Sequence, residues 1–91
     1  MDYNKKYSLH DENIDYRMTG EKAIILNANS AYFYTLEDTG ALIWEMLIKQ
    51  KTINEIIQLV MEEYEVSEEE LKSDIIALVA EMEKENLIKP L

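Results

Sequence analysis

The apolar residues of this 91-residue chain change their spacing once, near residue 37. Before that point Ile14, Tyr16 and Met18 alternate with polar residues, which is typical of a half-buried strand. Two further segments, 23–26 and 31–36, are rich in strand-forming residues, and turn sequences at 19–21 and 27–30 separate the three. After residue 37 apolar residues recur every three or four positions, which indicates amphipathic helices. The sequence therefore predicts an α+β fold.

The predicted helices begin at recognisable capping sequences. Asp38 or Thr39 is expected to begin a helix that runs to about residue 49, and capping boxes at 52–55 and 67–70 are expected to begin two more. The order β-β-β-α-α-α, a three-stranded antiparallel sheet followed by a three-helix bundle, fits a winged-helix-like domain. The expected apolar stripes are Ile43, Trp44 and Leu47 in the first helix, Ile53, Ile56, Ile57, Val60, Met61 and Tyr64 in the second, and Leu71, Ile75, Leu78 and Met82 in the third.

The two ends of the chain are expected to differ from this domain. Residues 1–13 are polar and are interpreted as a flexible N-terminal segment, so that the domain spans residues 14–91. Asn86 is expected to stop the third helix in a left-handed conformation, and residues 87–90 to leave it as a short extended tail.

Residues that could support catalysis are few. The chain has no cysteine, two glycines and one histidine, His10, which we interpret as an ordinary surface residue. A metal cluster, a thiol nucleophile and a glycine-rich phosphate loop are therefore not expected, and the paired carboxylates lie on predicted outer helix faces. We expect no enzymatic activity, no metal and no cofactor. The sequence also shows neither a signal peptide nor a membrane-spanning run, so a cytoplasmic protein is expected.

The charge of the chain is strongly negative and unevenly distributed. The net charge is −10, of which 8 acidic and 6 basic residues in 1–52 contribute −2, and 11 acidic and 3 basic residues in 53–91 contribute −8. Affinity for nucleic acid comes mainly from lysine and arginine, so this charge disfavours a nucleic-acid partner. The acids either keep the protein in solution or attract a basic partner.

The predicted strand 31–36 carries aromatic rings on both faces. In an extended chain Tyr32, Tyr34 and Leu36 point one way, whereas Phe33 and Thr35 point the other. As the last strand of a meander it would have one free edge, and Ala31–Leu36 contains no proline, lysine or other charge that would protect such an edge. Either the N-terminal segment shields this edge, or the edge accepts an extended peptide as an additional strand.

The predicted third helix has an apolar residue outside its main stripe. Ile76 lies about 100° from that stripe on a helical wheel, and Val79 lies at the edge of the stripe. Ile76 either packs against a neighbouring element or forms the wall of a shallow groove.

Several motifs, taken in order, resemble the PqqD family of peptide-recognition proteins. Residues 32–44 (YFYTLEDTGALIW) resemble the family's aromatic strand, Leu-Asn-x-Thr-Gly turn and apolar helix. Residues 52–56, 64–75 and 87–88 resemble the starts of its second and third helices and its terminal Leu-Ile. Glu37 replaces the usual asparagine and Asn86 the usual glycine. The resemblance covers about residues 14–90.

The resemblance implies a non-catalytic domain that binds the leader of a ribosomally made precursor peptide. The leader would add as a strand beside 31–36, lie against the third helix and be presented to a modifying enzyme, such as a radical SAM protein, a lasso-peptide leader peptidase or a lanthipeptide-type enzyme. The alternatives are a winged-helix DNA-binding regulator, which the acidic third helix disfavours, and a structural subunit of a larger enzyme. The predicted peptide-binding residues are Ala31, Tyr32, Phe33, Tyr34, Thr35, Leu36, Lys72, Ile76, Val79, Ala80 and Glu83.

Overall fold

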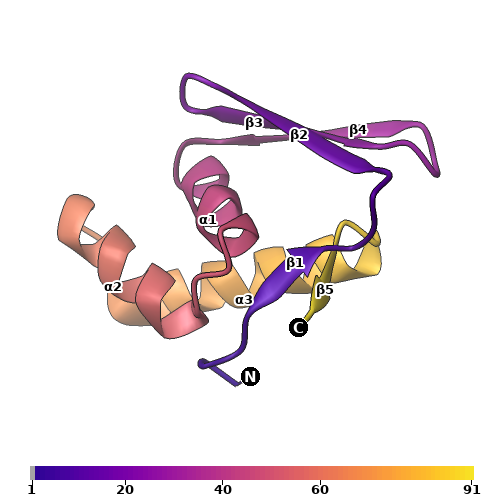
Figure 1. The fold of residues 1–91 in the computed structure, drawn as a ribbon. Helices are drawn as coiled ribbons and strands as arrows, with labels where there is room; N and C mark the ends of the chain where they lie inside the picture. The colour runs from indigo at the N-terminus through magenta and orange to yellow at the C-terminus, as the bar shows by residue number, and fades with distance from the viewer. Residues whose placement is uncertain (1) are drawn as a thin grey trace.

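A computed structural model describes residues 2–91, which form two small antiparallel sheets and three helices (Figure 1). The helices lie on one side of the larger sheet, with α1 directly beneath it. The elements are β1 (Tyr7–Leu9), β2 (Ile14–Thr19), β3 (Lys22–Asn27), β4 (Tyr32–Glu37), α1 (Asp38–Ile48), α2 (Ile53–Glu63), α3 (Glu68–Lys84) and β5 (Ile88–Pro90). The predicted α+β order of three strands followed by three helices is confirmed.

The larger sheet is an antiparallel meander with the order β2-β3-β4. Gly20, with φ of +60°, occupies the tight turn between β2 and β3, where a left-handed backbone favours glycine. The register pairs Tyr34 with Ile25 and Phe33 with Leu26. Because Ile25 is fully buried and Phe33 is 68% exposed, this register defines an inner face toward the helices and an outer face.

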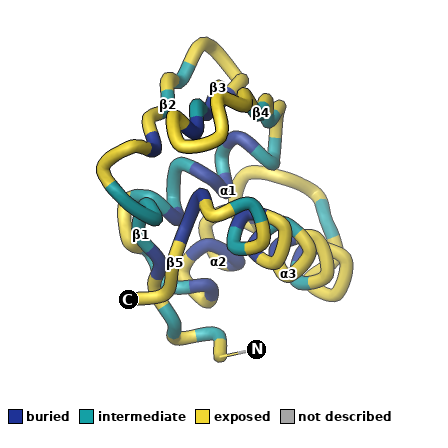
Figure 2. Tube along the Cα trace, turned by 90° about the vertical axis from the view of Figure 1, so that its right-hand side faces the viewer, coloured by how far each residue is buried: buried dark blue, intermediate teal, exposed yellow. Residues whose placement is uncertain are grey.

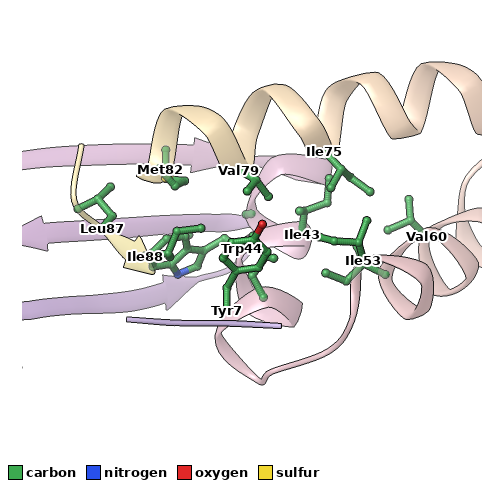
Figure 3. Packing of buried hydrophobic residues seen from close by; sticks show 14 of the residues in the cluster. Tyr7, Ile43, Trp44, Ile53, Val60, Ile75, Val79, Met82, Leu87 and Ile88 are labelled. Carbon is green, nitrogen blue, oxygen red and sulfur yellow. The ribbon is translucent and has the colours of Figure 1, made fainter. Parts of the chain in front are cut away.

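The core lies between the inner face of the sheet, the three helices and β5. Trp44 is fully buried at its centre, as predicted, and meets the ring of Tyr16 edge-on at a centroid distance of 5.9 Å. Figure 3 shows Trp44 among side chains from several elements, including Tyr7 and Ile88. The core therefore connects the strand-rich third of the chain to the helices and to both chain ends.

Both chain ends take part in a second sheet that the sequence analysis did not predict. Residues 7–9 form β1, which pairs with β5 in the register Tyr7↔Pro90 to Leu9↔Ile88. Tyr7 is 2% exposed, and Leu87 and Ile88 are buried as well. The segment 1–13 was interpreted as a flexible tail because its one strong anchor, Tyr7, is surrounded by polar residues. Its partner strand also lies about 80 residues away in the sequence.

The helix boundaries agree with the prediction in part. Thr52 and Glu55 form a complete capping box, whereas at the start of α3 only the bond from the Glu70 N–H to the Ser67 hydroxyl is present. Helix α1 begins after Glu37, which makes no side-chain capping bond, instead of at an Asp38 or Thr39 cap.

The reason for the difference in α1 lies in the backbone of Asp38. This residue is left-handed, with φ of 53°, and its N–H donates to the Glu21 carbonyl at 2.9 Å. Asn86 ends α3 with φ of 57°, as predicted. In α2 the expected stripe is too long, because Met61 and Tyr64 are 40% and 38% exposed.

Candidate functional site: a strand edge beside the third helix

The outer edge of β4 is free of strand partners among residues 2–91. β4 lies at the end of the sheet order β2-β3-β4, and the N-terminal segment pairs with β5 instead. β1 of the N-terminal segment therefore does not pair with this edge. Tyr32 and Phe33 are 66% and 68% exposed. β4 thus presents unpaired backbone N–H and C=O groups between exposed rings.

A cavity of about 290 Å³ lies where the beginning of β4 faces the end of α3. Its walls come from four places: the β3–β4 hairpin, β4 itself, the end of α3 and the segment after β1. The lining residues are His10, Asn27, Asn29, Ser30, Tyr32, Tyr34, Lys84, Glu85 and Asn86. The site is thus an open, mostly polar hollow beside an aromatic strand edge, at one end of the space between β4 and α3.

One hydrogen bond connects the two walls of this site. The Tyr34 hydroxyl donates to the Glu85 carboxylate at 2.7 Å. This bond, followed by desolvation, raises the pKa of the Tyr34 hydroxyl above its ordinary value, and the nearby charge of Glu81 acts in the same direction. Tyr34 therefore fixes which side of α3 faces β4.

The hairpin that begins β4 is organised by a buried asparagine. Asn27 is 4% exposed; its side-chain oxygen accepts from the Asn29 N–H at 3.0 Å, and its amide donates to the Glu85 carbonyl at 3.3 Å. The Asn27 carbonyl accepts from the N–H of Ala31, a left-handed residue with φ of 61°. These bonds hold the start of β4 against the end of α3.

Helix α3 has two flanks on either side of its buried stripe, and they face different parts of the molecule. Glu81 and Glu85 lie on the flank that faces Tyr34. Asp74 and Leu78 share this flank by helical spacing, and we call the four residues the strand-facing flank.

The opposite flank carries Lys72, Ile76 and Glu83 and faces the N-terminal segment. The Lys72 ammonium lies 5.2 Å from the centre of the Tyr3 ring. Burial raises the pKa of the Tyr7 hydroxyl, and Glu83 is close enough to raise it further. We call this the N-terminal flank.

The sequence-based site therefore combines β4 with residues of the N-terminal flank, whereas the flank that faces Tyr34 of β4 is the strand-facing one. Val79 is 1% exposed and belongs to the core, so its assignment to the groove wall is wrong. Lys72, Ile76 and Glu83 lie on the N-terminal flank, and Ala80 lies on the side of α3 opposite the core. The strand residues Ala31–Leu36 do lie together at the open edge, and their contact with a peptide stays a prediction.

Several residues of the site were missed by the sequence analysis. His10 was interpreted as an ordinary surface residue, Asn27 as part of a turn and Glu85 as part of a solvated helix face. The one available signal was the aromatic strand itself, because an inward-pointing Tyr34 hydroxyl needs a hydrogen-bond partner.

The side chains and backbone groups of the described residues suit the binding of a ligand better than a chemical reaction. No group of three histidine, cysteine or acidic side chains within 2–91 is arranged to hold a metal ion. No helix within this range is both long and apolar enough to cross a membrane. The site instead offers a strand edge, exposed rings and carboxylates, which together suit an extended peptide.

These features define a class of small α+β domains in which an open edge strand lies beside a helix. The chain belongs to the PqqD family: residues 22–88, well over half of the chain, match the family described as coenzyme PQQ synthesis protein D. The resemblance noted in the sequence is thereby confirmed. No curated protein sequence matches the chain significantly.

Two solved structures share this fold. One is a lasso peptide synthetase B1 complexed with the leader peptide, with a TM-score of 0.83 and 27% sequence identity over 93% of this chain and 99% of that one. The other is TbiB1 in complex with the TbiA(beta) leader peptide, with a TM-score of 0.83 and 17% identity over 90% of this chain and 94% of that one.

Proposed function

We propose that this protein binds the leader region of a ribosomally made precursor peptide and presents it, without catalysis of its own, to a modifying enzyme. The observation that carries the proposal is the unpaired edge of β4 beside the strand-facing flank of α3. Membership of the PqqD family and the similarity to a lasso peptide synthetase B1 complexed with its leader peptide support it. Binding would take place in the cytoplasm, where such precursors are synthesised.

The leader would add to the sheet as a strand next to β4. Every neighbouring pair in this sheet is antiparallel, and antiparallel pairing is slightly more stable per residue, so we expect an antiparallel leader. Such a strand would run from the Glu37 end of β4 toward Tyr32. Its C-terminal end would therefore leave beside the polar cavity, and the part of the precursor to be modified would follow from there.

The strand-facing flank would determine which leaders bind. Backbone hydrogen bonds to β4 depend little on the leader sequence, so selectivity must come from side chains. A leader side chain on the inner face would meet Tyr32, Leu78 and the carboxylates of Glu81 and Glu85. We therefore expect a leader with one apolar residue and one lysine or arginine on that face. Ordering of the leader costs free energy, so we expect a dissociation constant of about 1 µM.

A titration of isotope-labelled protein with the leader of the precursor encoded beside its gene tests this function. NMR shifts should concentrate in residues 31–36 and on the strand-facing flank. Tyr32→Ser should weaken binding at least about tenfold because it removes an exposed ring from the site. The matched control is Tyr64→Ser at the residue that follows α2, which should bind as the wild type does. Shifts confined to α2, or equal losses in both variants, would refute the proposed site.

The same geometry does not favour the alternative of a DNA-binding regulator. α3 carries seven acidic side chains, Glu68, Glu69, Glu70, Asp74, Glu81 and Glu83 together with its cap Glu85, against Lys72 and Lys84. Such a helix would be repelled from phosphates in a major groove.

A further inference from the structure

The outer face of the sheet carries an apolar hollow that the proposed leader site does not use. Phe33 of β4 lies directly across from Leu26 of β3, and Ile24 lies across from Thr35. Phe33 and Ile24 are 68% and 37% exposed. The hollow measures about 230 Å³, and Asp15 and Arg17 of β2 border it. The helices pack on the other face, so this hollow faces away from them (Figure 1).

Charge distinguishes this face from the rest of the molecule. The outer face carries two negative side chains, Asp15 and Glu37, and two positive ones, Arg17 and Lys22. Its net charge is therefore zero, whereas the whole chain has a net charge of −10. Lys22 and Glu37 also pair directly, at 3.5 Å. The outer face is thus neutral and partly apolar, a combination typical of surfaces that bind another protein.

The position of this face next to β4 relates it to the leader. A strand that adds to the free edge of β4 continues the sheet, and alternate side chains of that strand then point to the outer face beside Phe33. A protein seated on the hollow would therefore contact this chain and the bound leader at the same time. Only a leader-loaded chain would present the complete surface.

We propose that the outer face, centred on Phe33, Leu26 and Ile24, docks the enzyme that acts on the leader-bound precursor. The enzyme surface would contribute one or two aliphatic side chains set in a region without strong net charge. A second copy of this chain fits less well, because two chains of net charge −10 repel each other. This inference rests on the proposed leader binding and adds the surface to which the enzyme, the second partner, would bind.

The test separates leader binding from enzyme docking with one substitution. Ile24→Thr removes an aliphatic side chain from the hollow but keeps a residue that favours a strand, and Ile24 lies on the central strand β3, away from the edge that would take the leader. We expect its affinity for the leader of the neighbouring precursor to stay within about twofold of the wild type. The concentration of this protein needed for half-maximal processing by the enzyme encoded beside it should rise at least about tenfold. Thr19→Ser on β2, an exposed position outside the hollow, is the matched control and should change neither quantity.

Each outcome distinguishes the two proposals. A wild-type chain that does not bind the leader counts against the proposed function. Normal leader binding together with unchanged processing by Ile24→Thr overturns the docking inference alone, as does a loss of leader affinity in this variant. Sedimentation that shows a wild-type dimer and a monomeric Ile24→Thr variant with normal processing would also overturn it, because the face would then join two copies. Leu26→Thr provides a second, independent variant with the same expected result.

Discussion

The two flanks of α3 each carry one aliphatic residue but differ in charge and in what covers them. The strand-facing flank has three acidic residues, whereas the N-terminal flank has one acidic and one basic residue. Tyr3 and Tyr7 of the N-terminal segment lie against the N-terminal flank, and Tyr7 is itself part of the core. The strand-facing flank meets β4 through the Tyr34–Glu85 bond, beside a cavity of about 290 Å³. One flank of α3 thus lies against the N-terminal segment and the other beside the cavity, and Figure 2 shows buried, intermediate and exposed residues around this helix.

This difference shows how a domain of 91 residues can stay stable with an open strand edge. β1 and β5 form a small second sheet that ties both chain ends to the helices, as Figure 1 shows. Because the N-terminal segment completes this second sheet, it leaves the edge of β4 free for another chain. The covered flank should therefore respond to mutation as a folding element, and the open flank as a binding element.

The largest expected effect compares one tyrosine from each side. Tyr7 is 2% exposed beside the N-terminal flank, and Tyr32 is 66% exposed beside the strand-facing flank. Tyr7→Ala should lower the free energy of unfolding by about 3–5 kcal/mol, the usual cost of removing a buried aromatic side chain. Tyr32→Ala should change it by less than about 0.5 kcal/mol. Urea unfolding followed by circular dichroism measures both.

The reverse result would remove the basis of the comparison. If Tyr7→Ala unfolded at the same urea concentration as the wild type, the β1–β5 sheet would contribute little to stability. The N-terminal flank would then be as available to a ligand as the strand-facing flank.

A smaller effect distinguishes the flanks by charge. Glu81 and Glu83 lie two positions apart on α3 but on opposite flanks. Glu81→Lys should weaken binding of a basic leader about tenfold, which corresponds to about 1.4 kcal/mol, because it places like charges together. Glu83→Lys, with the same change in net charge, should have little effect. Isothermal titration with the leader of the precursor encoded beside the gene gives both dissociation constants. A loss of affinity confined to Glu83→Lys would show that the leader binds the N-terminal flank, as the sequence analysis predicts.

Added salt should weaken leader binding if the acids of the strand-facing flank contact basic leader residues. Exposed charges are screened over about 8–10 Å at 0.10–0.15 M salt. The dissociation constant should therefore rise several-fold between about 0.05 and 0.5 M salt, and less in Glu81→Gln. A constant that does not change with salt would mean that the acids serve only to keep the protein in solution.

The sequence alone predicts those parts of the fold that depend on local patterns. The meander follows from alternation in 14–18, from the strand-forming residues of 23–26 and 31–36 and from the turn at Gly20, and α2 follows from its capping box. Trp44 could be assigned to the core from its helical spacing. The β1–β5 sheet could not be predicted, because three-residue strands at opposite ends of a chain leave no periodic signal.

The sequence analysis placed the site on the N-terminal flank of α3 for a physical reason. A helical wheel finds the buried stripe but does not give the direction of the neighbouring strand, so two flanks remain possible. The predicted stripe included Leu78, which is only partly buried, and placed Val79 at its edge, whereas Val79 is buried. The predicted stripe is thus rotated slightly about the helix axis relative to the buried one. This rotation, together with the apolar Ile76, favoured the N-terminal flank as the groove wall. Glu85 belongs to the site because the Tyr34 hydroxyl donates to it. The two residues are 51 positions apart, so the sequence alone does not reveal this hydrogen bond.

The smallest expected effect tests the bond that separates the two flanks. The Tyr34 hydroxyl donates to Glu85, and this bond raises the pKa of Tyr34, whereas Glu85→Gln should return the pKa toward the ordinary value of about 10. Since the folded-state pKa lies above the unfolded one, the bond contributes stability below about pH 10 that is lost as pH rises through the folded-state pKa. NMR titration of the tyrosine ring carbons measures the shift directly. If the leader adds beside β4 against the strand-facing flank, a basic leader residue will compete for Glu85, and saturation with leader should lower the Tyr34 pKa as Glu85→Gln does. A Tyr34 pKa that is the same with and without leader would show that the leader leaves this contact intact and binds elsewhere along α3.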